Sequence, residues 1–95
     1  MAKAEVNGTI VADSENIQKV EGNIYFPEAS VKSEFLIDSE RRYTCGWKGD
    51  AVYHSLKIGE EVIPDATWVY PDPTEKAKNI KGYFAFDKSL VNITE

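Results

Sequence analysis

The chain has 95 residues, of which 42% are hydrophobic, and this fits one small domain over residues 1–95 and excludes a disordered chain. Its formal net charge of −5 repels phosphate backbones, so we expect no general nucleic-acid binding. A single cysteine, Cys45, excludes an internal disulfide and a zinc site of several thiolates. No apolar run has the length of a signal peptide or of a bilayer span, so we expect a cytosolic protein without membrane contacts.

The first half of the chain predicts short strands, because Val, Ile and Thr greatly outnumber Leu and Met. Asn7-Gly8 indicates a hairpin with strands at 3–6 and 9–12. A weak strand at 17–20, a turn at 21–23 and a strand at 24–26 follow. Pro27 favours the start of one or two helical turns that bury Val31 and Phe35, although residues 35–37 are equally compatible with a strand.

The second half of the chain predicts further strands. Charged residues 38–42 indicate an exposed loop, and residues 51–58 alternate with a period of two, which indicates a strand. A turn at 59–60 leads to a returning strand at 61–63, an interruption at Pro64-Asp65 and a strand at 67–70. One helical turn is expected at 74–79, followed by a last strand pair, 80–86 and 90–94, around a turn at 87–89. This spacing predicts a mostly β, antiparallel barrel or sandwich.

The segment TCGWKGDAVY, residues 44–53, carries the densest chemistry. A thiol, an indole, an ammonium and a carboxylate fall within six residues, at Cys45, Trp47, Lys48 and Asp50. Glycines on both sides of Trp47-Lys48 would let the backbone approach a ligand, while Trp47 offers a stacking face. The structural alternative is that Trp47 fills one end of the core and Lys48 extends to water.

This segment resembles a known family, the domain of unknown function 427. The resemblance covers residues 6–91 and rests on TCGWKGDAVY together with Tyr25-Phe26-Pro27, Trp68-Val69-Tyr70-Pro71, Ala77, Ile80-Lys81-Gly82-Tyr83 and Ala85-Phe86. It implies a compact antiparallel domain similar to the β-tent of methionine sulfoxide reductase B, and the family carries a nucleotidyltransferase-like label. Gly46 stands where the family often has proline. His54 stands where it often has a large aromatic residue, which favours a local substitution over a catalytic role.

The leading functional hypothesis is a binding module that recognises a small anionic or aromatic ligand, or a protein partner. Arg42 and Lys48 would supply charge for an acidic ligand. No cofactor or metal is expected, and one sequence does not reveal the oligomeric state. The side chains predicted to line the site are Cys45, Trp47, Lys48, Tyr53, Trp68 and Tyr70.

Two enzymatic functions, thiol chemistry and nucleotidyl transfer, are alternatives to the binding module, so the sequence does not decide whether the protein is an enzyme. Cys45 would serve as a nucleophile or redox thiol if His54 or Lys48 lowered its pKa. Nucleotidyl transfer would use Asp50 and Asp65 as metal-binding carboxylates and Lys48 as a phosphate contact. The candidate catalytic residues are therefore Cys45, Lys48 and Asp50.

Overall fold

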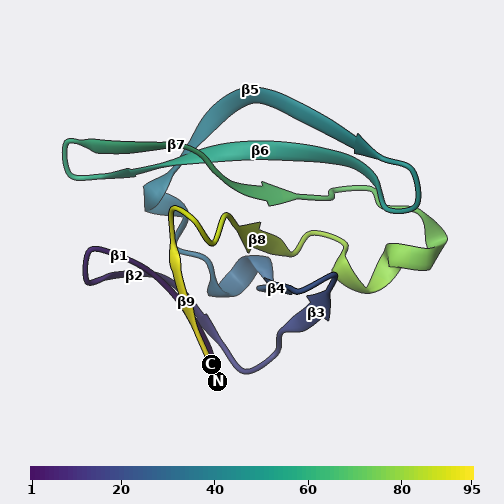
Figure 1. Cartoon of the computed structure of the whole chain (residues 1–95), viewed down its shortest axis with the longest axis horizontal. Coiled ribbons are helices and arrows are strands. Elements are labelled where there is room, and N and C mark those ends of the chain that lie inside the picture. The colour runs from purple at the N-terminus through teal and green to yellow at the C-terminus, as the bar shows by residue number, and fades with distance from the viewer.

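The computed structural model describes all 95 residues and shows a mostly β protein with three antiparallel sheets and three short 3-10 helices (Figure 1). The sheets have the strand orders β2-β1-β9, β3-β4 and β5-β6-β7-β8. None of the helices is both long and apolar enough to cross a bilayer. In chain order the elements are β1 (Ala2–Val6), β2 (Thr9–Ser14), β3 (Gln18–Val20), β4 (Asn23–Tyr25), η1 (Glu28–Ser30), η2 (Ser33–Phe35), β5 (Leu36–Cys45), β6 (Gly49–Ile58), β7 (Glu61–Val69), η3 (Glu75–Ile80), β8 (Phe84–Phe86) and β9 (Asn92–Thr94).

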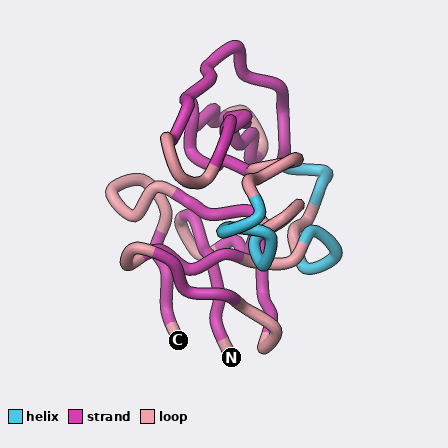
Figure 2. The backbone as a smooth tube through the Cα atoms, turned by 90° about the vertical axis from the view of Figure 1, so that its right-hand side faces the viewer, coloured by secondary structure: helices cyan, strands magenta, loops and turns pink.

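The long strands β5, β6 and β7 form one layer, and the smaller sheets lie on one side of it with the two termini close together (Figures 1 and 2). The first hairpin turns at Asn7-Gly8 as predicted, and both residues have positive φ, as a tight two-residue hairpin turn requires. Glu21 and Gly22 repeat this geometry between β3 and β4. The smaller hairpins therefore follow directly from local turn chemistry.

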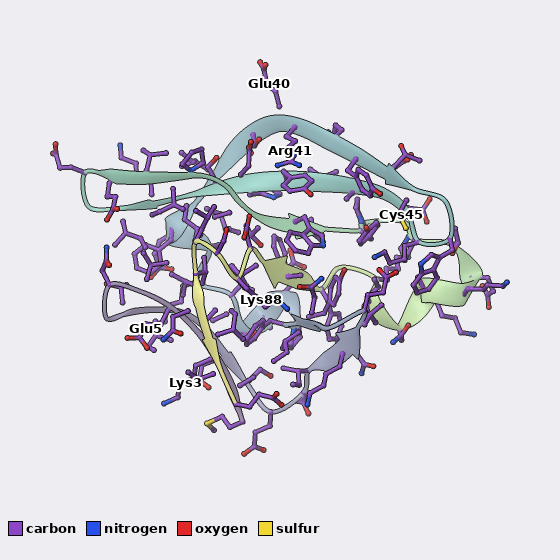
Figure 3. All side chains as sticks on the ribbon, viewed as in Figure 1. Lys3, Glu5, Glu40, Arg41, Cys45 and Lys88 are labelled. Atoms are coloured by element: carbon purple, nitrogen blue, oxygen red, sulfur yellow. The ribbon has the colours of Figure 1, made fainter.

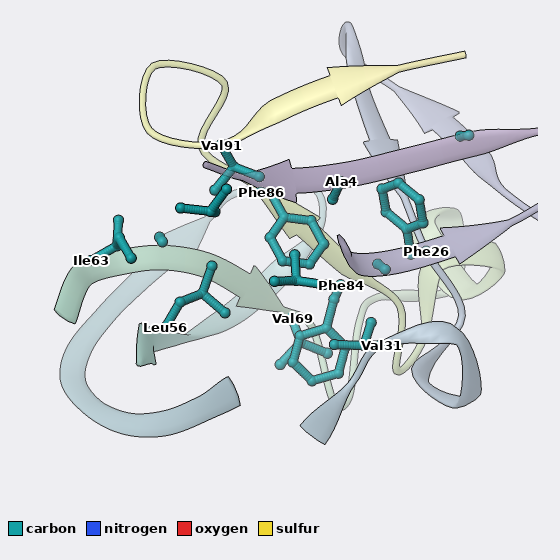
Figure 4. Packing of buried hydrophobic residues seen from close by; sticks show 14 residues of the cluster. Ala4, Phe26, Val31, Leu56, Ile63, Val69, Phe84, Phe86 and Val91 are labelled. Carbon is teal, nitrogen blue, oxygen red and sulfur yellow. The ribbon is translucent and has the colours of Figure 1, made fainter. Parts of the chain in front are cut away.

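The main core lies between the four-stranded sheet and the β2-β1-β9 sheet (Figure 4). Phe26 and Phe86 pack edge to face with their ring centroids 5.6 Å apart. Backbone hydrogen bonds between Phe26 and Phe84 join the end of the β3-β4 hairpin to β8. Both residues are buried. Their bridge connects the β3-β4 sheet with the four-stranded sheet, although the two sheets share no continuous strand ladder.

A second, smaller core lies on the opposite face of the four-stranded sheet, because its members Ala51 and Ala85 alternate with main-core residues along β6 and β8. Its buried members are Tyr25, Ala51, Tyr70, Ala77, Ile80 and Ala85. Cys45, Tyr53 and Trp68 are half-buried and pack against it. The predicted site residues therefore surround this second core rather than the main one.

The prediction of a barrel is wrong, because the three sheets do not close on one another. The predicted last strand pair is also wrong: β8 pairs with β7, while β9 crosses to the other layer and pairs with β1. Val91, buried just before β9, anchors this crossing in the main core. The β-tent arrangement suggested by the family resemblance stays a prediction.

Two predicted breaks lie inside strands. Residues 38–42, predicted as a loop, belong to β5, where pairing with β6 is irregular between Asp38 and Arg42. Their polarity has another cause, because β5 is an edge strand and most of its residues are exposed. Pro64-Asp65 lies within β7 and bulges opposite Ser55, whose hydroxyl accepts a hydrogen bond from the Asp65 N–H. The extra residues of this bulge belong to β7, so the predicted period of two along residues 51–58 holds, and Val52, Leu56 and Ile58 all contact the main core.

The predicted helical turns are present as 3-10 helices. The segment after Pro27 forms η1 and η2 rather than one α-helical stretch, and η3 covers the turn expected at 74–79. The expected burial is confirmed for Val31, whereas Phe35 is only partly buried against the main core.

Candidate functional site

The motif residues occupy the turn between β5 and β6, which Cys45 and Gly49 close as a register pair. Gly49 has a φ of +110°, and a Cβ there would lie 3.4 Å from the Asp72 carbonyl oxygen and the Pro73 Cα. The Thr74 N–H donates to the Lys48 carbonyl at 3.0 Å, and the Thr74 hydroxyl donates to the Trp47 carbonyl. Glycine is favoured at position 49 because L side chains rarely adopt this φ, while an added Cβ would only reach contact distance of residues 72–74.

Lys48 is the central residue of the site, because its side chain is buried although it carries a charge. Its Nζ lies 5.5 Å from the centroid of the Trp47 ring and 5.5 Å from that of the Tyr70 ring, over the faces of both. Its ion-pair partner is Glu21, from the turn between β3 and β4. Burial opposes the charge, but the hydrogen bond to Glu21 and the nearby tyrosines raise the pKa of Lys48, which stays protonated at neutral pH.

Glu21 presents both carboxylate oxygens to the motif. Its Oε1 accepts a hydrogen bond from Lys48 Nζ, and its Oε2 accepts one from Trp47 Nε1 at 3.2 Å. These two bonds, the Lys48 bond first, lower the pKa of Glu21. The Glu21 backbone has a φ of +54°, which non-glycine residues seldom adopt, and its side chain is half exposed. A carboxylate at the protein surface is thus bound by an ammonium and an indole N–H.

A row of aromatic side chains continues from this ion pair across the sheet. Trp68 packs edge to face with Tyr25 at 6.5 Å and donates its indole N–H to the Tyr25 hydroxyl at 3.1 Å. Tyr53 lies 5.9 Å from Trp68, and the Arg41 guanidinium lies 4.4 Å above the Tyr53 ring. Figure 3 shows Arg41 and Glu40 pointing to opposite sides of β5, with Cys45 further along the strand near its turn. The row therefore has a cation at each end, Lys48 and Arg41.

Burial changes the pKa of Tyr70, the tyrosine whose ring lies below the Lys48 ammonium. It raises the pKa of the Tyr70 hydroxyl to about 12, although the Lys48 ammonium acts in the opposite direction. Burial also raises the pKa of Tyr25, against the effects of its hydrogen bond from Trp68 and of the nearby Lys48. Both phenols are therefore neutral at physiological pH, and Glu21 supplies the negative charge beside Lys48.

The six residues predicted to line the site lie around one core, but their exposure differs. Trp47 is 40% exposed, Cys45, Tyr53 and Trp68 are half-buried, and Lys48 and Tyr70 are buried. The alternative that Lys48 extends to water is wrong, because its side chain is buried and its ammonium pairs with Glu21, while its contact with a ligand stays a prediction.

Other candidates lie apart from this cluster. The pairing of Cys45 with Gly49 places Cys45 on the face of the sheet that Tyr53 shares, so His54 projects from the opposite face and is not placed to activate the thiol. Arg42 pairs with Val52 on that same opposite face, where its guanidinium donates to the carbonyls of Ser39 and Arg41.

The two candidate metal-binding carboxylates do not converge. Asp50 accepts a hydrogen bond from the Thr44 hydroxyl at the start of β6, at 2.7 Å. Asp65 bonds Ser39 and Ser55, five residues further along β6, which corresponds to about 17 Å of strand. The structure therefore does not bring Asp50 and Asp65 together beside Lys48.

Sequence reasoning missed Glu21, Tyr25 and Arg41. Glu21 was assigned only to a turn, and its separation of 27 residues from Lys48 hides the ion pair. A glutamate beside glycine in a tight hairpin turn is unusual, since such positions favour asparagine, aspartate or glycine, and this was the one available signal. Tyr25 belongs to the segment that carries the family resemblance, but its own contacts depend on the tertiary fold.

Comparison with known proteins gives one result that agrees with these features. The model of a family described as a domain of unknown function (DUF427), with a nucleotidyltransferase-type short name, matches residues 1–95. A search of curated proteins finds no match. The family match spans the β5–β6 turn, the strand that carries Tyr25 and the segment from Trp68 to Phe86. The chain therefore belongs to the DUF427 family.

Proposed function

We propose that this protein is a binding module for a small ligand that carries a carboxylate beside a planar aromatic group. The ligand would bind where Trp47 and Lys48 now hold the carboxylate of Glu21. The observation that carries the proposal is this two-point capture, in which a buried ammonium and a half-exposed indole N–H bind the two oxygens of one surface carboxylate.

The charge of Lys48 explains why an anion is needed there. A buried ammonium is costly unless it is paired, and its only ion-pair partner is Glu21. A ligand carboxylate that displaced Glu21 would keep this compensation unchanged. Because Glu21 is on an exposed turn, its side chain can move into water while the two strands of its hairpin stay paired.

The surroundings of the ion pair suit an aromatic group on the ligand. The Trp47 ring is 40% exposed, and the half-buried rings of Tyr53 and Trp68 continue the aromatic row on the same side of the sheet. Rings prefer offset or edge-to-face contacts with other rings, which a planar ligand supplies. The two enzymatic alternatives gain no such support, since His54 lies across the sheet from Cys45 and the carboxylates of Asp50 and Asp65 are far apart.

Titration with benzoate tests the proposal, with the indole N–H signals of the two tryptophans followed by NMR and assigned with Trp47→Phe. We expect benzoate to shift the Trp47 signal in a saturable way. The variant Glu21→Gln, which removes the competing charge, should bind benzoate about tenfold more tightly, while Lys48→Met should lose binding. The control Glu75→Gln removes an exposed glutamate paired only with Lys78 and should behave as wild type.

Failure of the proposal has a distinct signature. If folded Glu21→Gln shows no saturable shift of Trp47 with millimolar benzoate, the ion pair is a structural clip between the two turns and the binding proposal is wrong. Because this variant keeps Lys48, the result does not depend on whether Lys48→Met folds.

A further inference from the structure

A groove lies on the face of the four-stranded sheet opposite to the Lys48 site. Val52, Val69 and Phe84 are register partners across β6, β7 and β8, and together they line its apolar floor. Phe84 belongs to the main core, whereas Val52 is only partly buried. Gly82 lines one side of the groove, and no atom lies within 4 Å of the position where a Cβ would be, so the space above it is open.

His54 lines this groove and has an unusual hydrogen-bonding state. Its Nδ1 is the one buried side-chain nitrogen or oxygen in the structure without a hydrogen-bond partner. A buried N–H without an acceptor is rarer in proteins than an unpaired acceptor, which favours the neutral tautomer with its proton on Nε2. Burial, first, and then the nearby Arg42 lower the pKa of His54 although Asp38 opposes them, so the ring is neutral at physiological pH. Nε2 is not among the buried atoms that lack a partner and makes no bond within the protein, so it offers a free N–H donor.

Two side chains of opposite charge complete the groove. Lys81 follows η3 and is held beside the end of β7 by a bridge to Tyr70. Glu28 lies at the start of η1, two residues after the bridge between Phe26 and Phe84. The three ion pairs of the structure involve other residues, so both charges are available to a ligand.

We infer that this groove, which we call the His54 groove, binds an apolar α-amino acid. The apolar side chain would rest on Val52, Val69 and Phe84, the carboxylate would accept from His54 Nε2 and pair with Lys81, and the ammonium would pair with Glu28. A zwitterion fits better than a plain acid because it uses both the Lys81 and the Glu28 charge. This site is independent of the one at Lys48, since it lies on the other face of the sheet.

Three matched probes test the inference: L-phenylalanine, 3-phenylpropionate, which lacks the ammonium, and phenethylamine, which lacks the carboxylate. Their binding is followed through the backbone amide signals of Val52, Gly82 and Phe84 by NMR. We expect saturable shifts of these amides with L-phenylalanine and about tenfold weaker binding of the other two probes. His54→Phe, which keeps an aromatic ring but removes the N–H, and Lys81→Gln should each weaken L-phenylalanine binding severalfold.

The variant Glu28→Gln gives the sharpest test. It should remove the preference for L-phenylalanine over 3-phenylpropionate, because the ammonium then has no partner. The control Lys76→Gln, on the exposed side of η3, should leave all three affinities unchanged. The inference is overturned if millimolar L-phenylalanine leaves these amides unshifted, if 3-phenylpropionate binds wild type as tightly, or if the preference survives in Glu28→Gln.

Discussion

Lys48 shows how a single side chain joins distant parts of this protein. Its ammonium is buried between the Trp47 and Tyr70 rings, and its only carboxylate partner comes from a turn 27 residues earlier. Exposed ion pairs contribute little to stability, but removing one partner of a buried charge leaves the other uncompensated. Glu21 therefore stabilises the fold through Lys48, even if it also holds the place of a ligand.

The pH dependence of stability should report this pair. The lowered pKa of Glu21 means that its charge stabilises the protein above pH 4.5, and that this contribution is lost as the pH falls through the folded-state value. The raised pKa of Lys48 means that its contribution is present below pH 10.5 and lost as the pH rises through its folded-state value. Urea unfolding of wild type and Glu21→Gln should therefore differ most between these two limits. An equally large difference well below pH 4.5 would contradict this account.

At the scale of elements, the β5–β6 turn is held by backbone contacts with the segment before η3. The acceptors are the backbone carbonyls of Trp47 and Lys48. The contacts therefore fix the backbone that carries these two side chains, but they would form equally with other residue types at positions 47 and 48. Gly49 is the position where the local sequence matters most, because its φ of +110° is a conformation that L side chains rarely adopt.

The two glycines of the motif should respond differently to substitution. Gly49→Ala should lower the free energy of unfolding by about 1–3 kcal/mol, since it forces an alanine into a left-handed conformation against backbone atoms. Gly46→Ala is the matched control, because its φ is ordinary and nothing lies within 4 Å of its added Cβ, so its effect should stay within about 0.5 kcal/mol. Equal effects in urea unfolding would show that the positive φ of Gly49 does not constrain the turn.

At the scale of the whole molecule, two cores share one sheet. Neighbouring residues at the end of β7 and in β8 face different cores: Val69 and Phe84 belong to the main core, and Tyr70, just after β7, and Ala85 belong to the second. The bridge between Phe26 and Phe84 ties the hairpin of Glu21 to the same sheet. The two cores share the strands β6 and β8, so neither core is built on a separate set of hydrogen-bonded strands. We therefore expect the two cores to unfold together.

A substitution in the main core tests whether the two cores unfold together. Phe26→Leu should lower the free energy of unfolding by roughly 1–3 kcal/mol. Trp68 packs against the second core, and Trp47 contacts Lys48, which also lies over Tyr70 of that core, so tryptophan fluorescence reports the unfolding of the second core, while far-UV circular dichroism reports all the strands. The two signals should shift to the same lower urea midpoint in the variant. A fluorescence midpoint that stayed at the wild-type value would show that the second core unfolds independently.

Local chemistry was sufficient to predict several elements, and the resemblance of the motif was sufficient to predict the family. Asn7-Gly8 specifies its hairpin because few other pairs tolerate two positive φ values, and Pro71 and Pro73 precede a helical turn, η3, as expected. The segment from Thr44 to Tyr53 identified the DUF427 family, which the family match confirms. The predicted turns depend on residues adjacent in the chain, whose conformational limits act before any tertiary contact forms.

Partners distant in the chain could be assigned only from the tertiary structure. Residues 38–42 look like a loop by polarity, yet they form part of an edge strand, where polar side chains face water. The sequence does not reveal that β9 pairs with β1, because many pairings of short strands satisfy the same period of two. The pairing of Glu21 with Lys48 was also missed, because charge pairing acts through space. Only the packing of the β3–β4 turn against the β5–β6 turn brings the two groups into contact.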